Sequence, residues 1–446
     1  MLSSPPQIIP MAAFEKSDDE MSWQHCGTED FRHSLEGKAT TTQSHLASSS
    51  YYLNRAPQFP EGCPKGYLTV FGAFMALFCT FGQMNAFGTF QTWYAEHQLS
   101  HLEPSTIAWI GSLQLWVFFF SGGPIGQLFD AYGPRWIMAI GSIIYVFSIM
   151  MTSISTQYYQ YLLAHGVLFG LGVGMLFYPS LSSVSTYFSK YRATALGVVA
   201  SGSSFGGVMY PIMLQRLFQL VGFGWGVRIS GLISGAVCCV AVFTVTRYAP
   251  PKQRGATCRL LETLTDSRFV LLATGSSFVA LGLFIPFFFI VDYARDLMIP
   301  ARMTFIVLAV MNAGGVVGRI APAYLSDKLG RFNLLAPRSL PVRTPLLPLM
   351  LFAATYGFTS GAFISVITPC VAQISDIRQI GSRIGILYSI ISFPALVGGP
   401  AAGALLEADK GQYTGLILFA GLTVIAGSVL ILAAKLRIDS RLFARV

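Results

Sequence analysis

Charged side chains are scarce in this chain of 446 residues. Lys, Arg, Asp and Glu make up 11% of it, hydrophobic residues make up 53%, and the mean hydropathy is +0.58. A soluble domain carries about a quarter charged residues, so this composition argues against a soluble protein. The net charge of +9 does not predict a nucleic-acid partner, because the basic residues lie between apolar runs and form no stripe.

The patterns of metal centres, covalent catalysis and nucleotide binding are missing as well. The seven cysteines show neither CxxC nor Cys/His spacing, and we expect free thiols without a disulfide or a metal. The apolar runs gather no Ser/His/Asp set and no paired carboxylates, and the glycine-rich GLGVG lies inside a run instead of between a strand and a helix. We therefore expect no enzyme activity, no cofactor and no drive by ATP.

Apolar runs longer than the roughly 20 residues of a membrane crossing make up most of the sequence. They predict an all-α membrane protein with eleven clear spans. The runs are Tyr67–Tyr94, Thr106–Leu128, Trp136–Ile154, Tyr161–Ser183, Thr194–Leu214, Gly226–Tyr248, Phe269–Val291, Thr304–Leu325, Leu346–Cys370, Ile384–Leu406 and Tyr413–Ala434.

The order of the runs predicts five parts. Residues 1–66 are expected to form a disordered cytoplasmic tail, since they are polar and contain no cleavable signal. Residues 67–248 form a first half of six helices, and residues 249–267 form a cytoplasmic link. Residues 268–434 form a second helical half, and residues 435–446 form a short cytoplasmic tail. The clusters of basic residues between the runs set this orientation.

Two polar links between runs echo each other. They are GQLFDAYGPRW (Gly126–Trp136) and GRIAPAYLSDKLGRF (Gly318–Phe332), and each places an aspartate three residues before a glycine that a basic residue follows. A helix–loop–helix signature repeated after about 200 residues indicates duplicated halves, which in membrane proteins usually enclose a substrate site at mid-bilayer.

The pattern GxLxDxxGxR of the first link resembles the loop between the second and third spans of the major facilitator superfamily, and the second link resembles its counterpart after the eighth span. The resemblance implies two six-helix halves that work by alternating access. It also implies a conformational gate that pairs with charges and helix ends across the cytoplasmic face. The gate residues are Gly126, Asp130, Gly133, Arg135, Asp327, Gly330 and Arg331. In the alternative interpretation the links only fix topology and a tight turn.

Longer stretches resemble the fungal branch of the monocarboxylate-transporter family. They include FGQMNAFGTFQTWYAEHQL, YFSKYRATALGVVASGSSFGGVMYP and the segment from YGFTSGAF to GGPAAGALL. The better-known relatives carry a lysine in the first helix and an aspartate one turn before an arginine of the eighth helix, both linked to proton-coupled uptake. This chain has Phe87 or its neighbour and Gly315 at those places, so simple proton-coupled monocarboxylate uptake is not predicted.

The ninth span of the family pattern is defective here. The segment LLAPRSLPVRTPLLPL contains four prolines and two arginines, and Arg338 and Arg343 would each cost about 2.5 to 3.5 kcal/mol at mid-bilayer. The single run Leu346–Cys370 would then have to join two basic loops on the same side of the membrane. We therefore expect a ninth span that is truncated or mis-spliced around residues 332–349, which puts activity of the chain in doubt.

Arg319 is the main candidate for substrate binding. It lies eight residues before Asp327, about 12 Å into the membrane, and it shares one helix face with Asn312 and Gly315. Its planar guanidinium suits a carboxylate, and Gly315 would leave room for a ligand. The family resemblance implies that an arginine at this place binds the substrate anion. In the alternative interpretation Arg319 is structural and binds carbonyls of a neighbouring helix or the Asp327 region.

Five further residues are candidates for the cavity, each with a structural alternative. Asn85 and Thr89 belong to a small, polar stripe that either lines the pathway or lets helices approach closely. The hydroxyls of Tyr178 and Tyr388 bind either a ligand or a neighbour. His165 is the one titratable group placed for proton coupling, with an unperturbed pKa of about 6.5, or it serves polar packing.

These observations predict a monomeric, multi-pass carrier in the lipid bilayer of the plasma membrane, with no metal and no nucleic acid. The expected cargo is a small organic anion or a carboxylated metabolite. Export of a secondary metabolite, or import of a neutral vitamin-like compound, is the alternative in which Arg319 is structural. A non-transporting membrane sensor or an inactive carrier is the alternative from a different class.

Overall fold

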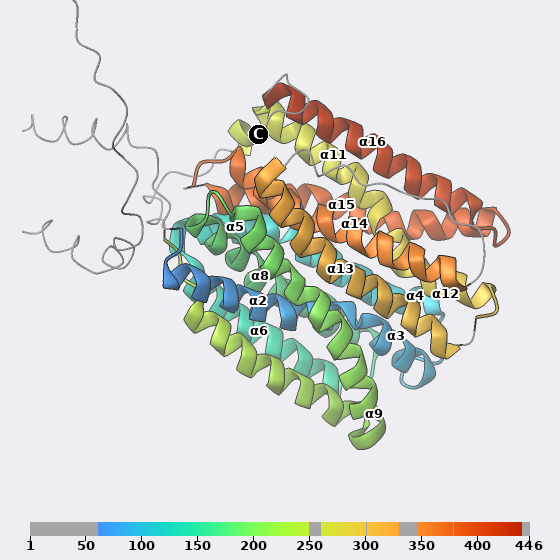
Figure 1. Ribbon diagram of the computed structural model, residues 1–446. Coiled ribbons are helices and arrows are strands. Elements are labelled where there is room, and N and C mark those ends of the chain that lie inside the picture. Colours follow the sequence, from blue (N-terminus) through green and yellow to red (C-terminus); the bar gives the residue numbers. More distant parts are fainter. Residues whose placement is uncertain (1–60, 249–259, 300, 330–345, 378, 439–446) are drawn as a thin grey trace, which may run out of the picture. The chain divides into compact units, whose positions relative to one another are not determined.

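The computed structural model describes residues 61–248, 260–299, 301–329, 346–377 and 379–438. Every regular element in these ranges is a helix (Figure 1), since apolar segments in lipid must pair their own backbone groups. The helices are α2 (Pro64–Asn85), α3 (Phe87–Glu96), α4 (Pro104–Phe120), α5 (Gly122–Tyr132), α6 (Pro134–Ile154), α7 (Tyr158–Tyr161), η2 (Leu162–Leu168), α8 (Phe169–Tyr187), α9 (Arg192–Thr244), α10 (Leu260–Thr265), α11 (Ser267–Leu283), α12 (Ile285–Asp296), α13 (Ala301–Leu329), α14 (Leu346–Gln373), α15 (Ile380–Ala408) and α16 (Thr414–Ile438).

The helices do not follow the predicted runs one for one. The first run divides into α2 and α3 at Ala86, and the second divides into α4 and α5 at Ser121, three residues before Pro124. A straight helix of the 53 residues assigned to α9 would be about 80 Å long, more than twice the hydrocarbon thickness. Gly222, with a φ of 78°, breaks α9 into two helices, as expected of a residue without a Cβ in the left-handed region.

Nine segments of the described residues are long and apolar enough to cross a membrane. One of them is α9, which holds the two helices that the sequence predicted as the fifth and sixth spans. The multi-pass helical character predicted from composition is therefore confirmed. The nine segments do not by themselves establish eleven spans or two halves of six helices.

Glycines set the distance between many of the helices. A Cβ added at Gly82 of α2 would lie 2.6 Å from Gly206 Cα of α9, and one added at Gly275 of α11 would lie 2.9 Å from Gly427 O of α16. In lipid the hydrophobic effect does not drive helices together, so the van der Waals contact that this close approach provides stabilises their packing. The described residues belong to one compact unit.

Helices α13 and α14 lie side by side and run in the same direction (Figure 1). Gly357 of α14 approaches Met311 O of α13, whereas Gly361, further along α14, approaches Gly315 O and the Arg319 side chain. The chain therefore leaves α13 at one end of the bundle and begins α14 at the other. The predicted defective ninth span, around residues 332–349, falls largely in this interval. Its residues 332–345 are outside the described residues, and residues 346–349 belong to the first turn of α14.

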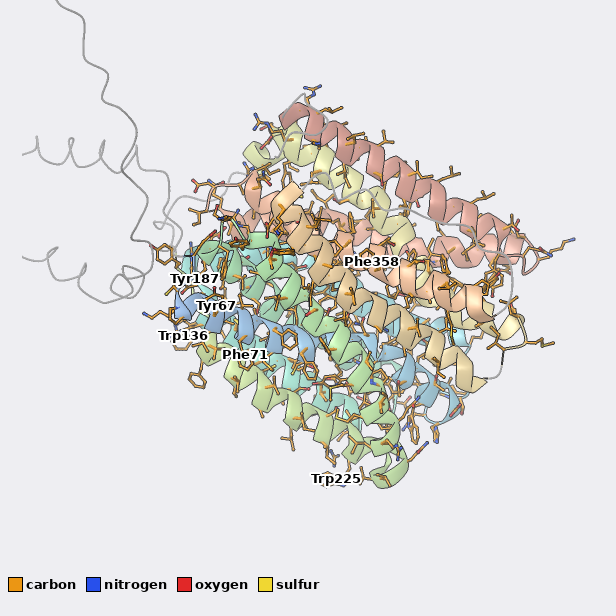
Figure 2. All side chains as sticks on the ribbon, in the orientation of Figure 1. Tyr67, Phe71, Trp136, Tyr187, Trp225 and Phe358 are labelled. Atoms are coloured by element: carbon orange, nitrogen blue, oxygen red, sulfur yellow. The ribbon has the colours of Figure 1, made fainter. Side chains whose placement is uncertain are left out.

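Asp130, at the end of α5, and Asp327, at the end of α13, lie at one end of the bundle. Thr194 and Arg247 contact them there, and we call this end the aspartate end. Trp136, at the beginning of α6, is 75% exposed, and Trp225, beside the α9 break, is 61% exposed. Figure 2 shows these two side chains at opposite ends of the bundle, as expected of aromatic residues at the two membrane surfaces.

The expectation of free thiols holds for four cysteines and fails for one. Cys79, Cys238 and Cys370 are buried and free, and Cys239 is free and exposed. Cys63, immediately before α2, is disulfide-bonded. The prediction was wrong there because no characteristic spacing in the sequence marks Cys63 as half of a disulfide.

Candidate functional site

The carboxylate of Asp130 joins the end of α5 to the beginning of α15. The residue is 3% exposed. Its Oδ1 accepts a hydrogen bond from Gly381 N (3.1 Å), and its Oδ2 accepts from Ser382 N (2.7 Å) and Ser382 Oγ (2.5 Å). The first amides of a helix have no partner inside the helix, and the helix dipole favours a negative charge beside them. Asp130 therefore caps a helix of the other predicted half.

Asp327 repeats this arrangement between the end of α13 and the beginning of α9. Its Oδ1 accepts from Ala193 N (3.1 Å), and its Oδ2 accepts from Thr194 N (2.7 Å) and Thr194 Oγ1 (2.8 Å). Each aspartate thus binds two successive backbone amides and one hydroxyl of a helix from the other predicted half. We call these two arrangements the Asp130 clamp and the Asp327 clamp. Each connects one of the echoed sequence links to a distant helix.

Small residues bring the clamped helices together. A Cβ at Gly122 of α5 would lie 2.9 Å from Gly385 O of α15, and a Cβ at Gly126 would collide with Gly381 O. At the Asp327 clamp, a Cβ at Gly197 of α9 would collide with Arg319 O of α13. At these contacts the helices meet backbone against backbone, which closes the space between them.

Arg247, three residues after α9, binds the carbonyl groups at the end of α5 that carries Asp130. Its Nη1 donates to Phe129 O and to Asp130 O, both at 3.0 Å, and its guanidinium lies 5.0 Å from the centre of the Phe129 ring. Burial lowers the pKa of Arg247, and the nearby Asp130 carboxylate opposes that shift, so the side chain stays charged. The sequence analysis did not single out Arg247, because nothing local marks an arginine that binds the end of a distant helix.

Ser389 connects α15, a helix of the second predicted half, to the break between α4 and α5. Its Oγ donates to Phe120 O and accepts from Gly123 N, both at 2.8 Å. Phe120 O would normally accept from the residue four positions on, but that residue is Pro124, which has no N–H. Ser389 therefore supplies the donor that Pro124 lacks. Ser389 was not among the predicted residues, although Pro124 in the sequence indicates that Phe120 O needs a donor from elsewhere.

The other predicted gate residues are placed differently. Gly133 has a φ of 78° at the turn from α5 to α6, a conformation that favours glycine. Arg135 is exposed and makes no hydrogen bond or ion pair with another residue that the structure describes. Gly330 and Arg331 lie outside the described residues.

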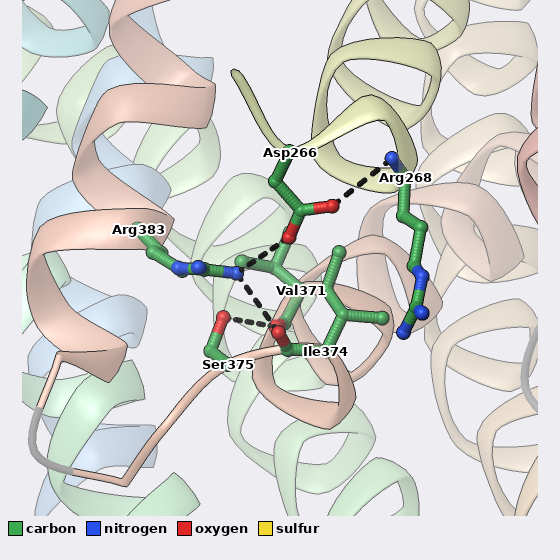
Figure 3. Close-up of polar contacts among 6 residues, drawn as sticks. All are labelled: Asp266, Arg268, Val371, Ile374, Ser375 and Arg383. Carbon is green, nitrogen blue, oxygen red and sulfur yellow. Dashed lines mark hydrogen bonds and ion pairs between the residues drawn. The ribbon is translucent and has the colours of Figure 1, made fainter. Parts of the chain in front are cut away.

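Arg383, in the first turn of α15, ties this helix to others of the second predicted half (Figure 3). Its Nη1 lies 3.2 Å from Asp266 Oδ2 and donates to Ile374 O at 2.8 Å, while Asp266 Oδ1 accepts from Arg268 N at 3.1 Å and so caps α11. The sequence marks Arg383 only as one of the basic residues between the apolar runs, which set the orientation in the membrane. The structure adds that it holds the beginning of α15, beside the residues that Asp130 binds.

Arg319 lies in the interior, with 8% of its surface exposed. Its Nη1 donates to Ser204 Oγ of α9, while its Nε has no hydrogen-bond partner among the described residues. A Cβ at Gly315 would lie 3.2 Å from the same Ser204 Oγ. In this conformation the space expected beside Gly315 therefore holds Ser204, and one side of the guanidinium remains for another acceptor.

The remaining polar candidates lie on three helices. Asn85, exposed at the end of α2, donates its Nδ2 to Ser203 O of α9 at 3.4 Å, next to the residue that Arg319 binds. Thr89 is half-buried in α3, and Asn312 is half-buried on α13. Asn85 and Arg319 thus approach neighbouring residues of α9, a proximity that sequence spacing does not predict.

His165 lies apart from this group, in an aromatic environment of the first predicted half. Its Nδ1 is 3.0 Å from the Tyr94 hydroxyl. The rings of Phe87, Phe90 and Phe169 lie 4.6 to 5.6 Å from the imidazole. Polar packing, the alternative weighed for this residue, describes its surroundings.

Tyr178 and Tyr388, far apart in the sequence, meet between α8 and α15. Their ring centres are 5.7 Å apart, and Phe119 stacks on Tyr388 at 5.9 Å. The Tyr178 hydroxyl donates to Phe118 O at 3.1 Å, and the Tyr388 hydroxyl is 3.2 Å from Thr368 Oγ1. Both hydroxyls therefore bind protein groups, and the rings fill the space between the predicted halves with aromatic surface.

A cleft of about 440 Å³ opens at the aspartate end. It is lined by Tyr132, Gly133, Pro134, Arg135, Trp136, Thr246 and Arg247. None of the predicted substrate-binding residues lines it, whereas two predicted gate residues do.

Comparison with known proteins gives one family throughout. The model of the Major Facilitator Superfamily matches residues 73–355. The chain is 37% identical to MFS-type transporter 1 of Ophiocordyceps sp. over 391 residues, which cover 85% of this chain and 87% of that protein. It is also 37% identical to the agnestins efflux protein of Paecilomyces divaricatus over 409 residues (90% and 94%) and to the aspyridones efflux protein of Emericella nidulans over 412 residues (89% and 84%).

Proposed function

The chain belongs to the Major Facilitator Superfamily, and from this premise we propose that it exports a small organic metabolite across a membrane by alternating access. The single observation that supports this mechanism best is the pair of clamps. Asp130 and Asp327 each bind the first amides of a helix from the other predicted half. Such bonds form when that end is closed and break when it opens, so they bias one of two states.

In this proposal the aspartate end faces the cytoplasm. Basic residues of five helix ends gather there, and such residues favour the cytoplasmic side. They are Arg135, Lys190, Arg192, Arg247, Arg383, Lys435 and Arg437. The chain enters α2 at the same end, because Glu61 accepts from Ser189 N. A cytoplasmic N-terminal tail is therefore part of the same proposal. The described conformation would then be closed towards the cytoplasm.

The direction of transport and the type of cargo are proposed from the relatives. Two relatives are named as efflux proteins for agnestins and for aspyridones, which favours export of a secondary metabolite over import. Eleven spans in two halves, the plasma membrane, and the narrower place in the fungal branch of the monocarboxylate-transporter family are parts of the same proposal. A monomer in the bilayer would suffice, because both clamps form within one chain.

A comparative metabolite profile tests this proposal. Cells with and without the chain are extracted, and their medium is analysed separately. The expected result is a metabolite that accumulates in the medium only when the chain is present. Accumulation inside the cells would instead establish import.

A small organic anion is the second candidate for the cargo, and Arg319 is the observation that favours it. The side chain is buried, and its Nε has no partner among the described residues, so an incoming carboxylate would provide a charge-assisted bond worth about 1.5 to 3 kcal/mol. If the cargo is an anion, Arg319→Gln lowers its transport by about tenfold or more. A neutral cargo would be transported at nearly the original rate.

Two controls separate this result from general damage. Arg437→Gln removes the same charge from an exposed position at the end of α16 and should leave transport unchanged. Reconstitution of the purified chain in liposomes tests whether a chain with parallel α13 and α14 and a predicted defective ninth span is active. Flux above that of empty liposomes shows an active carrier, whereas binding without flux indicates the sensor or the inactive carrier.

A further inference from the structure

Among the described residues, the lining of the cleft at the aspartate end includes two cations and no acidic residue. Arg135 and Arg247 contribute the charges, and Tyr132, Trp136 and Thr246 contribute the other side chains around the Gly133–Pro134 turn. The cleft lies where α5 ends and α6 begins, beside the segment that follows α9. Its electrostatic character therefore favours an anionic ligand.

The two arginines differ in how firmly they are held. Arg247 is fixed through its Nη1 on Phe129 O and Asp130 O. Thr246 beside it is held by the Tyr187 hydroxyl at 2.7 Å and by Thr69 Oγ1 at 3.1 Å. Arg135, which also lines the cleft, is exposed and makes no hydrogen bond or ion pair with another described residue. One guanidinium of the cleft is thus held in place, and the other is available to bind a ligand.

The aromatic side chains indicate where this anion comes from. Trp136 is 75% exposed and Tyr132 is 61% exposed, and both line the cleft. Figure 2 shows Trp136 at the same end of the bundle as Tyr67 and Tyr187. Tyr and Trp gather at the level of lipid headgroups. Arginine matches the geometry of a phosphate, and basic pockets between helices on the cytoplasmic side bind anionic headgroups.

We propose that this cleft binds the phosphate group of an anionic phospholipid, with Arg135 and Arg247 on the phosphate and Trp136 and Tyr132 beside the upper part of the acyl chains. The ligand would then contact Arg247, which holds the end of α5 that carries Asp130. The binding site does not depend on the identity of the cargo or on the direction of transport.

The test uses the full chain, purified in detergent and titrated with phosphatidylserine or with phosphatidylcholine of the same acyl chains. Native mass spectrometry counts the bound lipids. We expect phosphatidylserine to bind more tightly than phosphatidylcholine. Arg135→Gln should weaken phosphatidylserine about fivefold, which corresponds to about 1 kcal/mol for one basic side chain near the membrane surface. Arg135→Lys, which keeps the charge, should retain most of the affinity.

Arg437→Gln is the matched control, because it removes one exposed positive charge from the same end of the bundle outside the cleft. It should leave phosphatidylserine binding unchanged. The site is refuted if Arg135→Gln has no effect, if Arg437→Gln weakens binding as strongly, or if both lipids bind alike. Inorganic phosphate is added as a competitor, and displacement of the lipid by phosphate at equal concentration would show a small-anion site and overturn the lipid assignment.

Discussion

At the aspartate end, α5 meets α15 and α13 meets α9. In each contact one aspartate carboxylate accepts three hydrogen bonds of the same kind, yet the two contacts differ further into the bundle. Behind the Asp130 clamp lie facing glycines, Ser389 on the helix break, and the rings of Tyr178 and Tyr388. Behind the Asp327 clamp lies the buried Arg319, bound to Ser204. The first contact is closed by packing, and the second keeps a cation in the interior.

This difference bears directly on the proposed function. In that proposal the clamp is common to both contacts, because each holds the same end closed. The interior differs in the same proposal because recognition of one asymmetric cargo needs only one cation, and a second cation would carry its own desolvation cost in the membrane. Four substitutions test this comparison.

Asp130→Asn should have the largest effect. Removal of the charge weakens the bonds to Gly381 and Ser382, and a loss of about 2 kcal/mol would shift the equilibrium between the two states about thirtyfold. We expect transport to fall strongly while the protein remains in the membrane, measured as flux per molecule. Asp296→Asn, at the opposite end, is the control. Unchanged flux in Asp130→Asn would remove the gate assignment.

Gly126→Ala tests the close packing beside the same clamp. The added Cβ would collide with Gly381 O, and overpacking of this kind costs about 1 to 3 kcal/mol. We expect the aspartate end to open and flux to fall about tenfold. Gly88→Ala provides the control, because a Cβ at that glycine meets nothing within 4 Å. Equal flux in the two variants would show that the glycine contact does not hold the closed state.

Ser389→Ala removes the donor that compensates for Pro124. Phe120 O and Gly123 N would both lose their partner from α15. Hydrogen bonds between helices in membranes contribute about 1 kcal/mol, so we expect a change in flux of about fivefold. Ser392→Ala is the matched control, since Ser392 Oγ donates only within its own helix. Ser389→Thr should restore the flux, and a failure to do so would argue against the role of the hydroxyl.

His165→Gln should have the smallest effect on transport. Tyr94 and three phenylalanine rings surround His165, and glutamine retains a polar partner for the Tyr94 hydroxyl. We expect flux per molecule within about twofold of the original and an unshifted pH profile, with a loss of stability of about 1 kcal/mol at most. A displaced pH profile would instead support the coupling role.

The comparison also shows which parts of the site a sequence can predict. Asp130 and Asp327 were predictable, because a carboxylate between two apolar runs must lie near a helix end. Their partners Ser382 and Thr194 were not, because each lies more than 100 residues away and belongs to no local pattern. Arg247 and Ser389 were missed for the same reason. Arg319 was correctly placed in the interior, but its contact with Ser204 needed the packing of α13 on α9.

Composition and the period of the apolar runs determined by themselves that this chain is helical, crosses a membrane several times and repeats one polar link, since lipid permits few ways to pair a backbone. The pairing of each link with a helix from the other predicted half, the parallel course of α13 and α14, and the meeting of Tyr178 with Tyr388 were decided only by the tertiary structure. These contacts join residues far apart in the chain, and their geometry depends on how closely glycines let the helices approach.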